Sequence, residues 1–182
     1  MNAGQGRIGG PLWRIGHGAG RQGEAGLAPE VPVQPYASVA SALKDAVHVD
    51  AMILDGKPNA SAQTLEIAQA ADLCVIPTGP TVDDLHPGVV LAHSLRRKGV
   101  RPIVFAMVKT TASARETEAA RAYLAQAGYE VLAGEVPVST AYGQASDAGR
   151  AITETAFRSL NARASELAQS VVDRMAELME VV

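Results

Sequence analysis

The chain has a single cysteine, few aromatic residues and no large excess of charge of either sign. Cys74 has no second cysteine to pair with, so a disulfide within the chain is excluded; its apolar surroundings predict a buried, inert thiol. A formal net charge of −3 restricts nucleic-acid binding to a local basic patch. No window approaches the ~18 apolar residues of a membrane span, and the N-terminus lacks a secretory-type apolar core. We therefore expect a cytoplasmic protein.

The chain also lacks the lysine-containing glycine loop with which many nucleotide-binding proteins hold phosphates. The pattern Gly-x-x-x-x-Gly-Lys-Ser/Thr is absent, because Gly56-Lys57 is followed by Pro58 and Ala51 stands five residues before Gly56. The segment Gly4-x-Gly6-x-x-Gly9 matches a dinucleotide-binding spacing, but no strand pattern precedes it and no helix pattern follows it. We interpret that match as coincidental.

The first thirty residues differ in composition from the rest of the chain. Nine of the 17 glycines lie between Gly4 and Gly26, interspersed with Arg7, Arg14 and Arg21. Such a segment buries too little apolar surface to offset the entropy of ordering it. We expect residues 1–30 to be disordered or loosely draped, and residues 31–182 to form one α/β domain.

Two unbroken apolar runs separated by a helical stretch are the strongest structural signal. Ala51–Leu54 and Leu73–Ile76 show no polar alternation, and Ala60–Ala71 between them has the composition of a helix. This order is typical of parallel strands that are covered on both faces. Asp55 then follows the first strand at the carboxyl edge of the sheet, where open α/β folds bind ligands. A helix N-cap is the alternative role for this residue.

Further strands and helices continue the alternation. Ser113 and Glu116 have capping-box spacing, Gly99 suits a left-handed helix end, and Asp83 and Asp84 suit the first turn of a helix. The cluster 96–98 is basic, which suits either the end of a helix or contact with DNA. Predicted strands lie at 31–34, 102–108 and within 130–138, and predicted helices at 38–47, 82–98, 116–127 and 153–178. The prediction is a three-layer α/β fold, with a mostly parallel sheet, helices on both faces and a long C-terminal helix.

The order and spacing of several segments resemble the ParA/MinD family of deviant-Walker ATPases, and above all ParA-type partition proteins, which have a P-loop NTPase fold. The similarity spans about residues 31–172. The segments that carry it are Ile53–Pro58, Ala70–Pro77, Thr81–Leu85, Arg115-Glu116, Gly128–Leu132 and Tyr142–Ile152. The strand that carries the phosphate loop in this family has no counterpart here, so the sheet is expected to be N-terminally incomplete.

The resemblance implies ATP and Mg²⁺ as cofactors. Asp55 would be the catalytic carboxylate that holds Mg²⁺, directly or through water, and the residues after it would form a switch that senses the γ-phosphate. The implied nucleotide-binding residues are Gly56, Lys57, Pro58, Lys109 and Pro137. The resemblance also implies a homodimer that binds DNA non-specifically, has a centromere-binding, ParB-like partner and has no contact with a membrane.

Several explanations stay open for the missing phosphate loop. The first is that the phosphate loop is encoded upstream of Met1 in the full gene. The second is that the chain is a relic that no longer hydrolyses ATP. The third is that a partner protein supplies the phosphate-binding loop. Two other functions also stay open: a nucleotide-independent adaptor and a metabolic ATP-dependent synthetase of the same superfamily. In each case the missing strand predicts an exposed apolar strand edge that can pair with another chain.

The sequence predicts that this chain binds Mg-ATP poorly, because the triphosphate meets neither a nest of backbone amides nor a phosphate-binding lysine. Isothermal titration calorimetry is expected to detect no binding in the nanomolar-to-micromolar range. Tight binding of Mg-ATP to this chain would refute the inferred loss of the phosphate loop.

Overall fold

A computed structural model describes residues 12–15, 33–55 and 62–180. The chain divides into two compact units, residues 1–71 and residues 72–182, whereas the sequence suggested a single boundary near residue 31. Each unit is considered by itself.

The first unit contains a small antiparallel sheet and two helices. The strand order is β2-β1-β3, and β1 pairs antiparallel with both of its neighbours. Ser38 and Ser41 cap helix α1 reciprocally, because each side chain accepts a hydrogen bond from the other residue's backbone N–H. The elements are β1 (Leu12–Ile15), β2 (Val33–Gln34), α1 (Val39–Ala46), β3 (Ala51–Ile53) and α2 (Ala62–Ala70).

Strand β1 differs from the expectation of disorder over residues 1–30; the rest of that segment lies outside the described residues. Tryptophan and isoleucine favour strands, and they make up half of these four residues. The existence of β1 also changes the pairing of β3. The sequence predicted that β3 lies parallel to β4 in one sheet. In the described residues β3 instead pairs antiparallel with β1, with Trp13 opposite Ile53.

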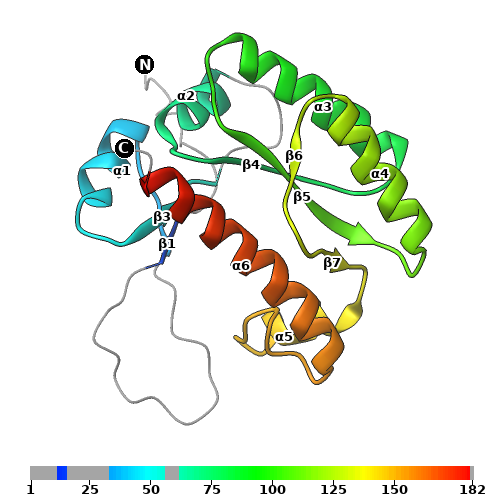
Figure 1. Cartoon of the computed structure of the whole chain (residues 1–182). Coiled ribbons are helices and arrows are strands. Elements are labelled where there is room, and N and C mark those ends of the chain that lie inside the picture. The colour runs from blue at the N-terminus through cyan, green and yellow to red at the C-terminus, as the bar shows by residue number, and fades with distance from the viewer. Residues whose placement is uncertain (1–11, 16–32, 56–61, 181–182) are drawn as a thin grey trace, which may run out of the picture. The chain divides into compact units, whose positions relative to one another are not determined.

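The second unit is built on a parallel sheet, as the sequence predicts (Figure 1). Strand β5 pairs in parallel with β4 on one edge, with Ile76 opposite Phe105, and also pairs in parallel with β6 and β7. Residues 103–107 are buried, which is why this run contains no polar alternation. The strands are β4 (Cys74–Thr78), β5 (Ile103–Thr110), β6 (Glu130–Val131) and β7 (Val136–Pro137).

Helices cover both faces of this sheet and complete the three layers. On one face Phe105 packs edge-on against Tyr129, which follows α4, and lies close to Gly88 of α3. On the other face Leu167 of α6 packs in a core cluster with Val104. The helices are α3 (Val82–Arg97), α4 (Ala114–Gln126), α5 (Thr140–Asp147) and α6 (Arg158–Glu180). Over the described ranges, no helix has the length and apolar composition needed to cross a lipid bilayer.

Strand β4 has one paired edge and one outer edge. The backbone N–H of Cys74 donates to Pro102 O at 3.1 Å, so alternate residues of β4 face β5. The backbone groups of Val75 and Pro77 therefore point to the outer edge, where no strand pairs with β4 among the described residues. Pro77 has no N–H, which leaves Val75 as the outward donor within the strand.

The ends of α3 and α4 are tied together around Tyr129. The Arg96 guanidinium lies 3.9 Å from the centre of the Tyr129 ring and donates to Gly128 O at 2.6 Å. Tyr129 Oη lies 2.8 Å from His93 Nδ1. Burial raises the pKa of Tyr129, and the nearby charge of Arg96 partly opposes that rise. This contact fixes α3 beside α4 on one face of the sheet.

The loop that joins β6 to β7 is held from both sides. From α4, Arg121 donates to Leu132 O at 2.8 Å and to Gly134 O at 2.5 Å. From α6, Ser170 Oγ donates to Ala133 O at 3.0 Å. Gly134 has a φ of +73°, and a Cβ atom there would overlap the backbone of α6 at Leu167. The position of β7 therefore depends on how α6 is packed.

This close approach predicts that Gly134→Ala destabilises the protein strongly. The substitution combines the left-handed backbone cost of about 1–2 kcal/mol with overpacking of about 1–3 kcal/mol. Gly149→Ala is the matched control, because Gly149 has a φ of +69° and open space around it, so it incurs only the backbone cost. Urea denaturation measures both variants. Equal losses of unfolding free energy would show that Gly134 is not in contact with α6.

Candidate functional site

The carboxyl edge of the parallel sheet gathers three strand ends and three helix starts (Figure 1). Strands β4, β5 and β7 end at Thr78, Thr110 and Pro137, and each continues within a few residues into α3, α4 or α5. Because the strands are parallel, these ends lie at one edge, where open α/β sheets bind their ligands. This edge is the candidate site.

Two of the helices at this edge begin with a serine cap. Ser113 Oγ accepts the N–H of Glu116 at 3.3 Å, and Ser139 Oγ accepts the N–H of Ala141 at 3.2 Å. Ser113 confirms the predicted N-cap of α4. Helix α5 was not predicted, although a Ser-Thr pair ahead of a stretch containing Ala and Tyr is a recognisable N-cap signal. The positive ends of these helix dipoles face the same edge.

Two carboxylates at this edge accept hydrogen bonds from threonines that precede their helices. Asp84 Oδ2 accepts from Thr81 Oγ1 at 3.0 Å and lies so close to Gly79 that a Cβ there would overlap it. Glu116 Oε2 accepts from Thr111 Oγ1 at 2.7 Å. These bonds agree with the interpretation of Asp84 as a helix-dipole partner and not as a ligand.

Lys109 lies in a bulge at the end of β5. Its φ is +54°, a left-handed conformation that costs a non-glycine residue about 1–2 kcal/mol. Val108 pairs with Val136 and Thr110 with Pro137, so β5 advances two residues where β7 advances one. Lys109 and Pro137, two residues that the sequence assigned to one site, are therefore on neighbouring strands.

Thr110 is a feature of the edge that sequence reasoning missed. Its side chain is 0% exposed, and its Oγ1 has no hydrogen-bond partner among the described residues. Its backbone O accepts the N–H of Val138 at 2.9 Å. A buried hydroxyl without a partner costs about 1–3 kcal/mol. No sequence signal marks it, since its burial depends on the bulge beside it.

The remaining predicted site residues belong to the first unit. Asp55 is exposed and follows β3. Gly56, Lys57 and Pro58 lie outside the described residues. The assignment of Asp55 to catalysis and to Mg²⁺ therefore stays a prediction. In the ranges that the structure covers, no group of three or more His, Cys, Asp and Glu side chains is arranged to hold a metal ion.

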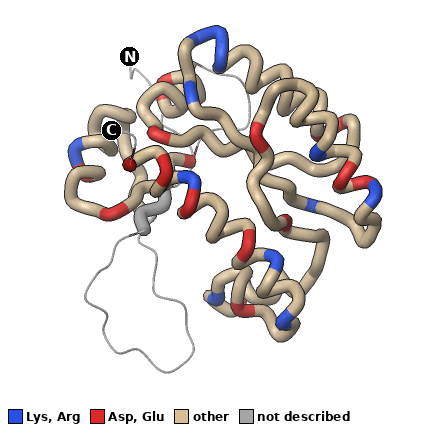
Figure 2. Tube along the Cα trace, viewed as in Figure 1, with Lys and Arg blue, Asp and Glu red and all other residues tan. Residues whose placement is uncertain are grey.

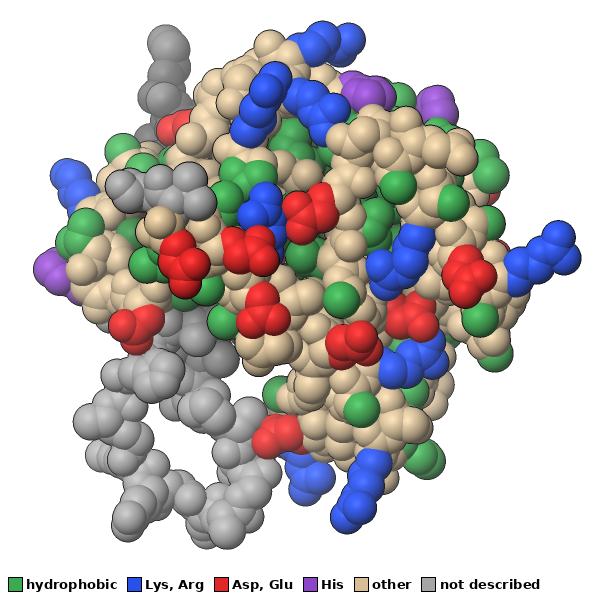
Figure 3. All heavy atoms as spheres, in the orientation of Figure 1, with side chains coloured by type: hydrophobic (Ala, Val, Ile, Leu, Met, Phe, Trp, Pro, Cys, Tyr) green, Lys and Arg blue, Asp and Glu red, His purple; other side chains and the backbone are tan. Residues whose placement is uncertain are grey.

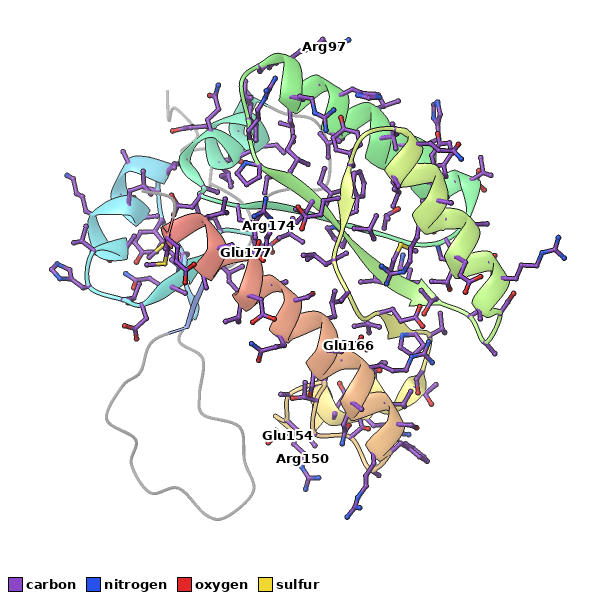
Figure 4. The ribbon with its side chains drawn as sticks, in the orientation of Figure 1. Arg97, Arg150, Glu154, Glu166, Arg174 and Glu177 are labelled. Atoms are coloured by element: carbon purple, nitrogen blue, oxygen red, sulfur yellow. The ribbon has the colours of Figure 1, made fainter. Side chains whose placement is uncertain are left out.

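The basic cluster lies at the opposite end of α3 from the candidate site (Figure 2). Arg96 is engaged by Tyr129 and Gly128, whereas Arg97 projects from the surface (Figure 4). Cys74, which the sequence predicted to be a buried and inert thiol, is half-buried, and burial raises the pKa of its thiol. A raised thiol pKa keeps the thiolate fraction low, as expected for an unreactive cysteine.

Comparisons with known proteins show a distant likeness to a solved structure. No protein-family model matches the chain, and no curated protein matches its sequence. Among solved structures, a protein described as a partition protein is 20% identical over 69% of this chain, with a TM-score of 0.43. The aligned region spans 35% of that protein's own length.

The unpartnered hydroxyl predicts that Thr110→Val leaves the free energy of unfolding unchanged or raises it by about 1 kcal/mol. Thr78→Val is the control, since Thr78 is also buried but donates to Gly79 O at 3.2 Å. That variant is expected to lose about 1 kcal/mol. Urea denaturation compares the two. A clear loss of stability in Thr110→Val would mean that its hydroxyl is bonded in solution.

Proposed function

We propose that this chain is the body of a ParA-like partition protein and that its carboxyl edge receives the base end of an adenine nucleotide. The order of the family-like segments supports the family. The pairing of β5 with β7 is the single observation that carries the site, because it brings Lys109 beside Pro137. The family resemblance assigns those two positions to the nucleotide.

The residues at this edge suit a nucleoside. A nucleotide base needs an apolar surface and a few well-placed polar groups. Val138, which is 72% exposed, provides the apolar surface, and Pro137 before it is buried. Lys109 is exposed and contributes a positive charge.

The phosphate end would depend on other residues. The family resemblance assigns Asp55 to Mg²⁺ and Lys57 to the switch segment, and both assignments stay predictions. Mg²⁺, when bound, offsets the negative charge of the phosphates. Because the sequence lacks the glycine loop that normally holds them, most of the binding energy available to this chain comes from the nucleoside.

The proposal extends to the biological role. As a ParA-like protein, the chain would act in plasmid or chromosome segregation in the cytoplasm. Its partners would be a centromere-binding, ParB-like protein, a second copy of the chain and non-specific DNA. ATP hydrolysis by this chain alone would be weak or absent.

Titration with a fluorescent ATP analogue tests the nucleotide site. Binding is expected near 1 mM, which corresponds to about −4 kcal/mol. Lys109→Gly is expected to weaken binding severalfold while it stabilises the fold by about 1 kcal/mol, because it relieves the left-handed backbone. Arg97→Ala removes an exposed cation away from the site and serves as the control. Unchanged affinity in Lys109→Gly would contradict the placement of the nucleotide.

A nucleotide-independent adaptor is the second candidate. The outer edge of β4 favours it, because a strand edge without a partner among the described residues can pair with another protein. Complete absence of nucleotide binding, together with retained binding to a partition partner, would favour this function over the first.

A further inference from the structure

Strand β7 is too short to set its own position on β5. It consists of Val136 and Pro137, and Pro137 has no N–H to donate to the ladder. The N–H of Val138, which donates to Thr110 O at 2.9 Å, adds a bond just beyond the strand. A pairing with so few backbone bonds specifies its register weakly. Contacts outside the ladder must therefore hold β7 in place.

The position of β7 matters for Lys109, because this residue lies at the irregular step of the pairing. Lys109 has a φ of +54° and stands between Val108 and Thr110, the two residues that pair with β7. A non-glycine residue stays in the left-handed region only where its surroundings hold it there. If β7 shifted, the bulge would lose the partner that defines it, and Lys109 would return to the extended conformation of a regular strand.

Helix α6 holds the residue that immediately precedes β7. Arg163 of α6 forms an ion pair with Glu135, the neighbour of Val136. The side chain of Glu135 is 21% exposed, and its second carboxylate oxygen, Oε2, is buried without a hydrogen-bond partner among the described residues. Removal of the pairing cation would leave this buried charge uncompensated. The ion pair therefore ties the start of β7 to α6.

Helix α6 also contacts the segment that follows β7. Tyr142 of α5 donates from its hydroxyl to Leu160 O of α6 at 3.1 Å. Burial raises the pKa of Tyr142, and the charge of Arg163 partly opposes that rise, which indicates that the two side chains lie near one another. Contacts with α6 thus bracket β7 along the chain, at Glu135 before it and at Tyr142 after it.

We propose that Arg163 is a positioning residue for the carboxyl edge of the sheet. Through its ion pair with Glu135 it holds β7 in the register that keeps Lys109 left-handed and beside Pro137. The structural part of this proposal needs no ligand, whereas its effect on nucleotide affinity rests on the proposed function.

A second ion pair on α6 offers a matched control. Arg174, labelled in Figure 4, bonds Glu130 at 3.0 Å, and Glu130 belongs to β6, which pairs with the first half of β5. Figure 3 shows acidic and basic side chains beside one another over α6, as expected of ion pairs that stay partly exposed. Both pairs join α6 to a strand of the sheet, but only the pair of Arg163 adjoins β7.

Nuclear magnetic resonance of the full chain without nucleotide tests the structural part. The Cα and Cβ chemical shifts of Lys109 report its backbone conformation, and hydrogen exchange of the Val138 N–H reports its bond to β5. The double variant Glu135→Gln, Arg163→Met removes the ion pair without leaving a buried charge unpaired. It is expected to move the Lys109 shifts toward those of a strand and to speed exchange at Val138 at least about tenfold. Arg174→Met is expected to change neither.

Titration with a fluorescent ATP analogue tests the effect on the proposed site. The double variant is expected to weaken binding severalfold, but to have no further effect when combined with Lys109→Gly, because that variant has already lost the lysine and its conformation. Arg163→Lys keeps the charge beside Glu135 and is expected to retain both the Lys109 shifts and the affinity. Circular dichroism checks that each variant stays folded.

Native Lys109 shifts and native Val138 exchange in the double variant would overturn the proposal. Equal changes in Arg174→Met would do so too, because they would reflect general loosening of α6. Weakening of the same size in the Lys109→Gly background would refute the route through Lys109. If the unaltered chain binds no nucleotide, the proposed function fails, while the magnetic resonance comparison still decides whether Arg163 positions Lys109.

Discussion

Strand β5 is buried on both faces and is paired with three neighbours, and the rest of the second unit is arranged around it. Phe105 faces α3 and α4, while Val104 faces α6, so one strand defines both helical layers. Its end also organises the candidate site. Because β7 pairs with the last residues of β5, the bulge at Lys109 determines which residues of the two strands lie side by side.

The parts of the fold that were predictable are those determined by local composition. The unbroken apolar run at 102–108 predicted a buried strand, and Ser113 and Gly99 predicted helix ends, as the structure confirms. Strand β1 was not predicted, since short apolar stretches within glycine-rich sequence carry little periodicity. The antiparallel pairing of β3 was not predicted either, because its partner in that pairing is β1.

The candidate site was predictable only in part. A resemblance assigned Lys109 and Pro137 to one site, and their strands are indeed neighbours. The left-handed conformation of Lys109 and the unpartnered hydroxyl of Thr110 depend on the register between β5 and β7, which no local pattern encodes. Asp55 belongs to the other unit, and its role stays a prediction. The site and α6 are also connected, because the loop before β7 is bonded to Arg121 and Ser170.

Pro77 has a consequence for how the sheet can grow. A strand added along the outer side of β4 would find one amide donor, at Val75, and then a proline where the next donor should be. Repeated stacking of copies, as in a fibril, needs an uninterrupted run of donors and acceptors. Pro77 therefore limits the stacking of many copies along the outer edge of β4. A short hydrogen-bonded pairing with one added strand is still possible.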